Sequence, residues 1–205
     1  MCLNGKEKMK QKTNNNSSNS SSPPMEGLGE AIIQVENLTK QFGSFTAVKG
    51  ITFDVYKGEI FGFLGANGAG KTTAMKMLIG ISNPTSGKAN VAGLDVATQA
   101  DLVKKSIGYM SQKFSLYDAL TIKENITFFG GIYGLSRKLI KEKTQQLITK
   151  LEMQDVANNL VGSLPLGWKQ KLSFSVALLH EPKIVFLDEP TGGVDPITRR
   201  QFWEM

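Results

Sequence analysis

One stretch of the sequence, GANGAGKTT, constrains the fold more than any other because it matches the pattern GxxxxGK[ST]. Its glycines let the backbone curl so that successive amide hydrogens point at phosphate oxygens, and a helix that follows presents its positive N-terminus to the same anion. In this pattern Lys71 reaches the β- and γ-phosphates of a nucleotide, and the hydroxyl of Thr72 ligates Mg²⁺. The residues predicted to bind ATP here are Gly65, Asn67, Gly68, Ala69, Gly70, Lys71, Thr72 and Thr73.

The segments that flank this loop have the periodicities that it requires. Residues 31–43, AIIQVENLTKQFG, alternate like a strand, and residues 51–65, ITFDVYKGEIFGFLG, are typical of strands that run into the loop. After the loop, KTTAMKMLIG has helical spacing and ends at Gly80, an ordinary C-terminal cap position. Strand, loop and helix in this order form the context in which a phosphate loop works.

The remaining sequence predicts an α/β core that is interrupted by helices. Residues 88–93 (KANVAG) and 107–110 (IGYM) are typical of short strands, and Thr98 is a candidate helix cap. From residue 113 to about residue 175 the periodicity is helical, which indicates an inserted helical subdomain. The apolar run IVFL at 184–187 then predicts a fully buried parallel strand. We therefore expect an α/β fold, a P-loop NTPase core containing a parallel sheet, with a helical insertion.

Two adjacent carboxylates, Asp188 and Glu189, directly follow this last strand. In an open α/β sheet the ligand sits beyond the carboxyl ends of the strands, so the strand would deliver Asp188 beside the phosphate loop. Asp188 can hold Mg²⁺, directly or through water, and Glu189 can polarise a water for in-line attack on the γ-phosphate. An ordinary strand-to-turn junction would also explain these acids alone. Their pairing with the phosphate loop favours a catalytic interpretation.

Composition adds limits on location and partners. The chain has 205 residues, 40% of them hydrophobic, and a single cysteine, Cys2, so we expect a globular domain in a reducing compartment, the cytoplasm. No apolar stretch approaches the roughly 18 residues that span a bilayer. Residues 1–29 form a polar, basic tail, expected to be a disordered extension or a linker. A basic arm for anionic lipid or RNA is the alternative, but we expect no nucleic-acid partner.

The motifs together resemble the nucleotide-binding domain of an ATP-binding cassette (ABC) transporter over residues 30–205. The resemblance rests on GANGAGKT, on Gln112 after a strand, on the helical insertion, and on VFLDEPTGGVDP. It implies that Phe42 stacks on adenine, that Gln112 senses Mg²⁺ and the attacking water, and that Asp195 lies in a loop that crosses to a second copy. The respective structural alternatives are core or edge packing for Phe42, a surface turn for Gln112, and the turn acid before Pro196 for Asp195.

One motif departs from the usual family pattern. Most members have LSGGQ where this chain has LPLGW, so Pro165 replaces a serine and supplies neither a hydroxyl nor an amide hydrogen. The sequence LPLGWKQ resembles that of a subgroup of ABC-2-type exporters. We expect the contact to the partner's nucleotide to depend on Gly167 and on the N-terminus of a helix from Lys169. His180 precedes the two acids and is expected to cap a helix rather than to act in catalysis.

The resemblance implies an ATPase, the cytoplasmic ATP-binding subunit of an ABC-2-type exporter, lying on the inner face of the membrane. Its partners would be ATP, a second nucleotide-binding domain (in a homodimer or a tandem cassette) and an integral-membrane ABC-2 permease. The alternatives are a soluble ABC ATPase that acts on ribosomes or DNA, and a non-catalytic nucleotide-binding fragment. The family's catalytic switch histidine would fall beyond Met205. We therefore expect a truncated cassette whose ATP hydrolysis is near background.

Overall fold

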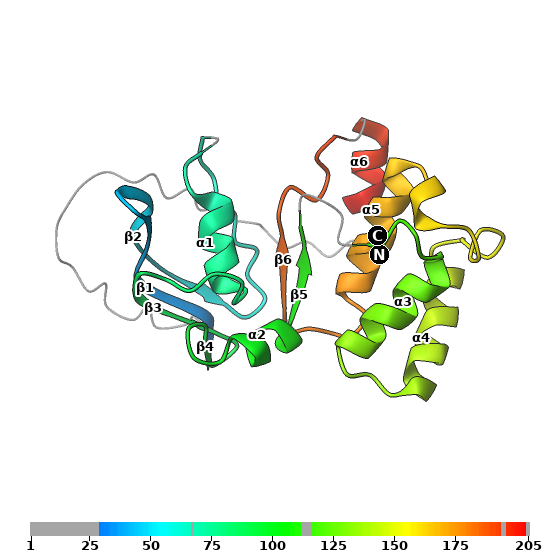
Figure 1. The fold of residues 1–205 in the computed structure, drawn as a ribbon, viewed down its shortest axis with the longest axis horizontal. Helices are drawn as coiled ribbons and strands as arrows, with labels where there is room; N and C mark the ends of the chain where they lie inside the picture. Colours follow the sequence, from blue (N-terminus) through cyan, green and yellow to red (C-terminus); the bar gives the residue numbers. More distant parts are fainter. Residues whose placement is uncertain (1–28, 67, 112–115, 194–195, 204–205) are drawn as a thin grey trace.

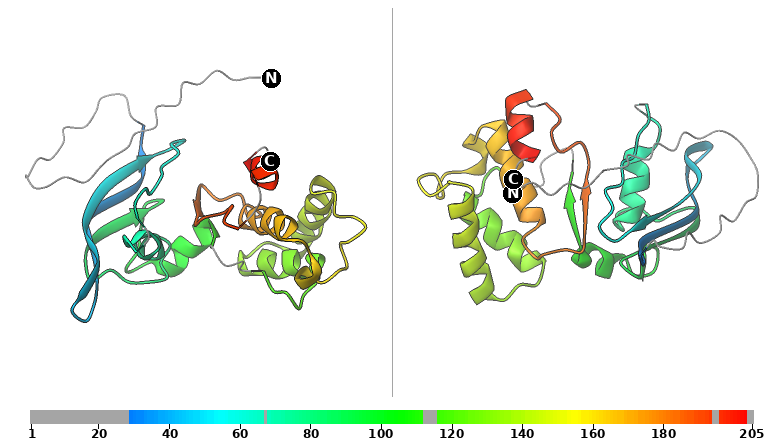
Figure 2. Two further views of the ribbon diagram at one scale, coloured as in Figure 1. Left: turned by 90° about the horizontal axis from the view of Figure 1, so that it is seen from above. Right: turned by 180° about the vertical axis from the view of Figure 1, so that it is seen from behind.

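A computed structural model of the protein describes residues 29–66, 68–111, 116–193 and 196–203. A β-rich half with α1 and a helical half lie on either side of the β5–β6 pair (Figures 1 and 2). The elements are β1 (Ala31–Phe42), β2 (Phe45–Tyr56), α1 (Lys71–Leu78), β3 (Ser86–Val91), β4 (Leu94–Asp95), α2 (Ala100–Ser106), β5 (Ile107–Met110), α3 (Ile122–Ile132), α4 (Arg137–Lys150), η1 (Val161–Ser163), α5 (Leu166–Ala177), β6 (Ile184–Leu187) and α6 (Pro196–Trp203). The tail predicted over residues 1–29 lies almost entirely outside the described residues.

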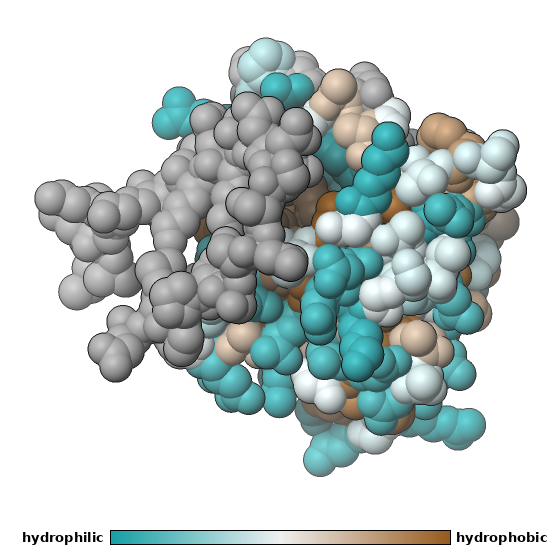
Figure 3. Space-filling view, turned by 90° about the vertical axis from the view of Figure 1, so that its left-hand side faces the viewer, coloured by the Kyte–Doolittle hydropathy of each residue, from teal (hydrophilic) through white to brown (hydrophobic). Residues whose placement is uncertain are grey.

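The β-rich half is built on a four-stranded antiparallel sheet with the order β2-β1-β3-β4. In β1, Ile33 and Val35 alternate as predicted, and a register shift between Val35 and Leu38 brings Leu38 into the same core. The apolar side of α1 covers the same core with Met77 and Leu78. Figure 3 views the molecule from the side of this sheet, and where grey atoms leave this face uncovered, the surface is mostly hydrophilic or neutral, with smaller hydrophobic areas between. The core shared by the sheet and α1 fixes the position of this helix.

A second, two-stranded sheet joins the two halves. β5 and β6 pair in parallel, with Ile107 opposite Ile184 and Met110 opposite Leu187, so both predicted strands and the parallel pairing are confirmed. The expected full burial of the last strand is wrong, because only Phe186 of its four residues is buried. Phe186 and Ile107 belong to the core under α1. The carboxyl end of β6 is thereby fixed close to the β-rich half.

The strand expected immediately before the phosphate loop is not formed. β2 ends at Tyr56, and residues 59–66 have no regular structure and pair with none of the described strands. Ile60 is 89% exposed and Leu64 is 76% exposed, because no neighbouring strand covers them. Phe61 instead stacks on Phe53 at 4.8 Å between ring centroids. The prediction of a strand here is therefore wrong, because a strand needs a partner for its backbone as well as an apolar sequence.

The helical half has a hydrophobic core of its own. Buried apolar side chains from α3, α4, α5 and their connections form it, among them Ile122, Ile126, Ile148, Val161 and Leu172. α3 starts with a capping box, in which Thr121 accepts from the backbone of Glu124 and the Glu124 carboxylate accepts from the backbone of Thr121. This hydrogen bond, followed by the one from the Thr121 hydroxyl, lowers the pKa of Glu124. The start of α3 is therefore specified locally.

Two short helices test the predicted caps. α1 ends with Ile79 as its C-cap, and Gly80 follows with φ 72°, as expected for a glycine after a helix. The expected cap of α2 is wrong, because its N-cap is Gln99 and no side chain caps it. Thr98 instead donates to the Asp95 carboxylate from its backbone at 2.8 Å and its hydroxyl at 3.0 Å. These hydrogen bonds lower the pKa of Asp95.

Candidate functional site

The phosphate loop is held against β2 by a glycine with no room for a side chain. Gly70 is the N-cap of α1 with φ 83°, and a Cβ added to it would lie 2.2 Å from the carbonyl oxygen of Ala47. No side chain caps α1, and its first turn contains no acid. The backbone N–H groups at the start of a helix need an acceptor, and an anion supplies it most favourably. Local geometry therefore leaves the start of α1 suited to a phosphate.

Lys71 already lies across this loop. Its Nζ donates to the carbonyl oxygens of Gly65 at 2.7 Å and of Ala66 at 2.9 Å. The lysine is the first residue of α1, so its stem is fixed by the helix while its ammonium stays within the curl of the loop. An ammonium in this position adds its charge to the N–H groups of the helix start. The predicted loop residues Gly65, Gly70 and Lys71 are thus brought together.

The carboxylate predicted to complete the site lies next to the loop. The Oγ1 of Thr72 is 3.5 Å from Oδ1 of Asp188, although the two residues are 116 positions apart in the sequence. Asp188 is only 9% exposed, and its backbone N–H donates to Met110 of β5 at 2.9 Å. Burial raises the pKa of the Tyr109 hydroxyl, and the charge of Asp188 contributes to this shift. The end of β6 therefore presents a carboxylate to the start of α1.

These two oxygens fit a hard divalent cation. A hydroxyl and a carboxylate are ligands that Mg²⁺ prefers, and it usually keeps several waters and binds substrate phosphates as well. Within the described parts of the chain, no group of three or more His, Cys, Asp or Glu residues could hold a metal ion. Thr72 and Asp188 could therefore supply two ligands, and phosphate and water would have to supply the rest.

Glu189 begins a tight turn directly after the strand. It has φ 50°, an uncommon conformation for a residue with a side chain, and its carbonyl accepts from the backbone of Gly192 at 2.9 Å. The carbonyl of Gly192 in turn accepts from Nε2 of Gln170 at 3.3 Å. Gln170 is buried on α5, so this bond ties α5 to the turn that carries Glu189. Sequence reasoning missed Gln170, because it lies between two lysines and nothing in the local pattern marks it.

A cavity of about 510 Å³ lies between the phosphate loop and β2. Phe45 is among its lining residues, together with Phe63, Leu64 and Lys71, whereas Phe42 is not. Phe42 is 55% exposed, and the Nζ of Lys40 lies 5.2 Å from the centroid of its ring. Phe42 and Phe45 are paired across the end of the β1–β2 hairpin. Sequence reasoning singled out Phe42, but of these two aromatic residues only Phe45 lines the cavity beside the loop.

The other predicted residues are not gathered at this loop. Gly167 lies in the first turn of α5, on the opposite side of β5 and β6 from α1 (Figure 1). The expected helix start at Lys169 is wrong, because α5 begins at Leu166 with Pro165 as its N-cap. Proline suits that place because its missing N–H needs no partner at a helix start. The predicted site residues Asn67, Gln112 and Asp195 lie outside the described residues.

His180 does not cap a helix, so that prediction is wrong. Its Nε2 contacts the carbonyl oxygen of Ile107 at 3.1 Å, which is the first residue of β5 and not part of α5. Its ring stacks on Tyr133, with 3.8 Å between centroids. Burial lowers the pKa of His180, and the nearby charge of Lys143 lowers it as well. The histidine joins the end of α3 to the start of β5, away from Asp188.

The chain is similar to proteins of one large family. The family model described as ABC transporter matches residues 48–192. A relative in Escherichia coli (strain K12), named "Probable multidrug ABC transporter ATP-binding protein YbhF", is 48% identical over 175 residues, or 85% of this chain and 30% of the relative. "Nod factor export ATP-binding protein I" of Rhizobium sp. (strain N33) is 38% identical over 177 residues, or 86% of this chain and 58% of the relative.

Solved structures agree with these similarities. A structure described as the ATP binding subunit of an ABC transporter matches with a TM-score of 0.75 and 27% identity, over 84% of this chain and 72% of that chain. The predicted P-loop NTPase fold is thereby confirmed. The chain spans about a third of the length of the Escherichia coli relative. In the part of the chain that the structure describes, no helix is long and apolar enough to cross a membrane.

Proposed function

This chain belongs to the ABC transporter family, and from this we propose its function. It is the ATP-binding part of an exporter and binds ATP together with Mg²⁺ between the phosphate loop and the end of β6. One observation carries this proposal, namely the 3.5 Å approach of the Thr72 hydroxyl to the Asp188 carboxylate. The loop alone would suit many phosphates, but a loop with an adjoining carboxylate suits a phosphate with its metal ion.

Each residue then has a distinct role in ATP hydrolysis. Lys71 neutralises the β- and γ-phosphates, while Thr72 and Asp188 hold Mg²⁺. Glu189 orients and polarises the attacking water, and the bond from Gln170 to the Gly192 carbonyl keeps its turn in place. Gln112 senses the metal and this water, as the family resemblance implies. Phe42 stacks on adenine, and Phe45 is the second aromatic residue available for that contact.

The partners in this proposal are a second nucleotide-binding domain and an integral-membrane ABC-2 permease. Gly167 and Asp195 act toward the second domain, in a homodimer or a tandem cassette. This agrees with the position of Gly167 across the β5–β6 pair from the phosphate loop of its own chain. Residues about 113–175 form a helical subdomain that transmits ATP-dependent closure to the permease. The chain works at the cytoplasmic face of the membrane, consistent with relatives named as export and resistance ATP-binding proteins.

Equilibrium binding of a fluorescent ATP analogue with Mg²⁺ tests the nucleotide site. Lys71→Ala should weaken binding by at least about tenfold, because a charged hydrogen bond to phosphate is lost. Lys76→Ala is the matched control, since Lys76 is an exposed lysine on the same helix and lies outside the cavity. Equal affinity in both variants would contradict the role of Lys71.

A further inference from the structure

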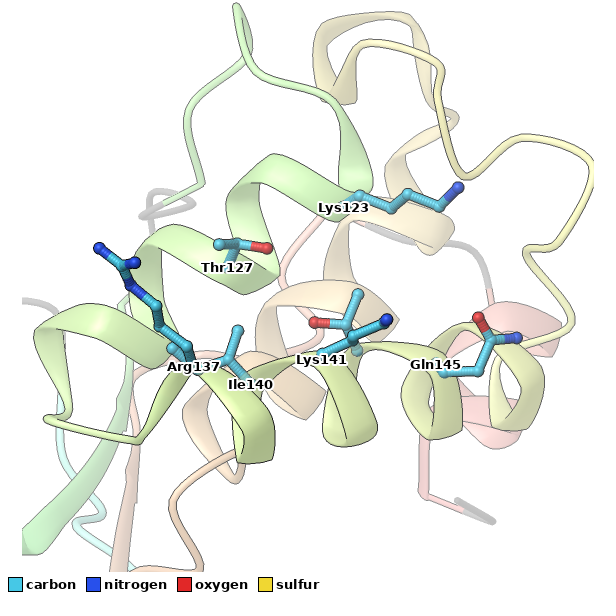
Figure 4. Close-up of a pocket in the computed structure, with 7 residues that line it drawn as sticks. Lys123, Thr127, Arg137, Ile140, Lys141 and Gln145 are labelled. Atoms are coloured by element: carbon cyan, nitrogen blue, oxygen red, sulfur yellow. The ribbon is translucent and has the colours of Figure 1, made fainter.

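A groove between α3 and α4, far from the phosphate loop, gathers positive charge. It has a volume of about 430 Å³. In Figure 4 the side chain of Arg137 extends to one side of the groove and that of Lys123 to the other, with Thr127 on α3 and Lys141 on α4 between them. The lining residues are Lys123, Thr127, Arg137, Ile140, Lys141, Thr144 and Gln145. Three of these residues are cationic and none is acidic.

The groove has a structural cause in the packing of the two helices. A Cβ added to Gly130 of α3 would lie 2.8 Å from Cγ1 of Ile140 on α4, so the helices approach most closely where a glycine permits it. Ile140 forms the floor beside this contact, and Thr127 lies one turn earlier on α3. The helices form an antiparallel hairpin through a short loop, so the cations of both line a single hollow.

The charges in the groove are not balanced by the described residues. The ion pairs in the described parts of the chain are Lys104–Asp101, Lys143–Glu181 and Lys169–Asp118, so none involves a lining residue. Lys123 donates to the side-chain oxygen of Asn158 at 3.0 Å, a neutral partner. Arg137 and Lys141 are four residues apart on α4, a spacing at which like charges repel, and an anion beside them relieves that repulsion.

A buried polar atom inside the groove is a second, independent indication. The Oγ1 of Thr144 is buried and has no hydrogen-bond partner among the described residues. A buried hydroxyl without a partner costs free energy, and a ligand oxygen in the groove would satisfy it. Thr127 and the Gln145 amide offer further neutral donors from the two helices. The groove thus combines three cations with neutral donors, which is the donor set of an anion site.

We propose that the α3–α4 groove binds a phosphate-bearing ligand, either a free anion such as a diphosphate or the phosphate of a lipid headgroup. A phosphate group concentrates two or more charges on a small volume, so Arg137 and Lys141, one turn apart on α4, can act on it together. The guanidinium of Arg137 matches phosphate oxygens in pairs. The volume lies in the range of small-molecule sites. This site is separate from the nucleotide site and does not depend on it.

Titration of the ¹⁵N-labelled full chain with inorganic pyrophosphate tests the proposal. Amide resonances of α3 and α4 report on the groove, and those of α1 report separately on the phosphate loop. The double variant Arg137→Gln, Lys141→Gln should weaken the response of α3 and α4 by at least about tenfold in affinity and leave that of α1 unchanged. The control Lys138→Gln, Lys150→Gln removes the same charge from exposed positions of α4 outside the groove and should keep the response.

A second arm identifies the source of the phosphate. Sedimentation with vesicles of phosphatidylcholine, with and without phosphatidic acid, is measured for the same variants. Vesicle binding that needs phosphatidic acid, and that is lost only in the groove variant, supports a lipid headgroup. Pyrophosphate binding alone, with the same dependence on the groove variant, supports a free anion. If neither probe binds at α3 and α4, or if both double variants lose binding equally, the proposal is overturned.

Discussion

The helical half and the segment that leads to the phosphate loop are stabilised in different ways. Asn125, buried in the helical half, accepts from the backbone of Tyr117 and donates to the carbonyls of Tyr117, Leu120 and Thr121. By contrast, residues 59–66 pair with none of the described strands, and Ile60 and Leu64 are exposed. The loop they lead to depends on the fit of Gly70 and on the contacts of Lys71. The phosphate loop therefore lies in a less supported part of the fold, as is common for ligand-binding loops.

Among the variants considered, Asn125→Ala in the helical half should cause the largest loss of stability. The variant removes the four hydrogen bonds of a fully buried side chain and leaves the backbone N–H of Tyr117 without its acceptor, so the free energy of unfolding should fall by about 3 kcal/mol. Urea unfolding followed by circular dichroism measures it. Asn159→Ala, at an exposed position of the same half, is the control and should change stability little. Similar midpoints for both variants would mean that the Asn125 network does not stabilise the helical half.

In the phosphate loop, Gly70→Ala should lower the free energy of unfolding more than Gly68→Ala does. Both glycines have φ above 80°, but only at Gly70 would the new Cβ meet a backbone oxygen, that of Ala47 at 2.2 Å. We expect Gly70→Ala to cost about 2 kcal/mol more, with weaker nucleotide binding. Thermal unfolding and titration with an ATP analogue report the two effects. Equal behaviour would show that backbone conformation alone, and not the contact with β2, limits the loop.

The caps of α3 and α4, the two helices that form the groove, should give a smaller effect. Thr121→Ala removes one half of the capping box of α3 and should lower stability by about 1 kcal/mol. Ser136→Ala should cost less, because Ser136 offers α4 a single bond of 3.3 Å from Leu139. Hydrogen exchange of the first turn of each helix localises the change. A greater loss for Ser136→Ala would reverse the predicted ranking.

The smallest effect should be a pH dependence that originates at His180. Burial lowers its pKa below the ordinary value of 6.5, so folding favours the neutral ring. This contribution to stability is complete above that value and is lost as the pH falls through the lower pKa of the folded state. Stability should therefore decrease on acidification below neutral pH, and less steeply in His180→Gln. Parallel slopes of stability against pH for the two proteins would exclude His180 as the source.

Local patterns predicted much of this fold, because their cause is local. The phosphate loop, α1 with Gly80 after it, and the strands β5 and β6 all follow from spacing within a few residues. The failures depend on distant partners. Residues 59–66 lack a neighbouring strand, Thr98 is bonded to Asp95 rather than to α2, and His180 contacts the start of β5.

The candidate site divides in the same way. The phosphate-loop residues and the acids after β6 could be identified from the sequence, because the motif itself indicates their chemistry. Gln170 could not, because its role rests on a contact with Gly192 that only the packing of α5 against the turn creates. Phe45 was also missed, since an aromatic near a hairpin turn has no distinguishing pattern, and only the cavity beside the loop draws attention to it.

The affinity for ATP with and without Mg²⁺, measured in Asp188→Asn and Glu189→Gln, tests the central claim most directly. Mg²⁺ should strengthen ATP binding to the unaltered protein, and Asp188→Asn should remove most of that gain because a metal ligand is lost. Glu189→Gln should retain it, because its carboxylate serves the attacking water and acts mainly in the transition state. An equal loss of the Mg²⁺ effect in both variants, or no loss in Asp188→Asn, would contradict a metal site formed by Thr72 and Asp188.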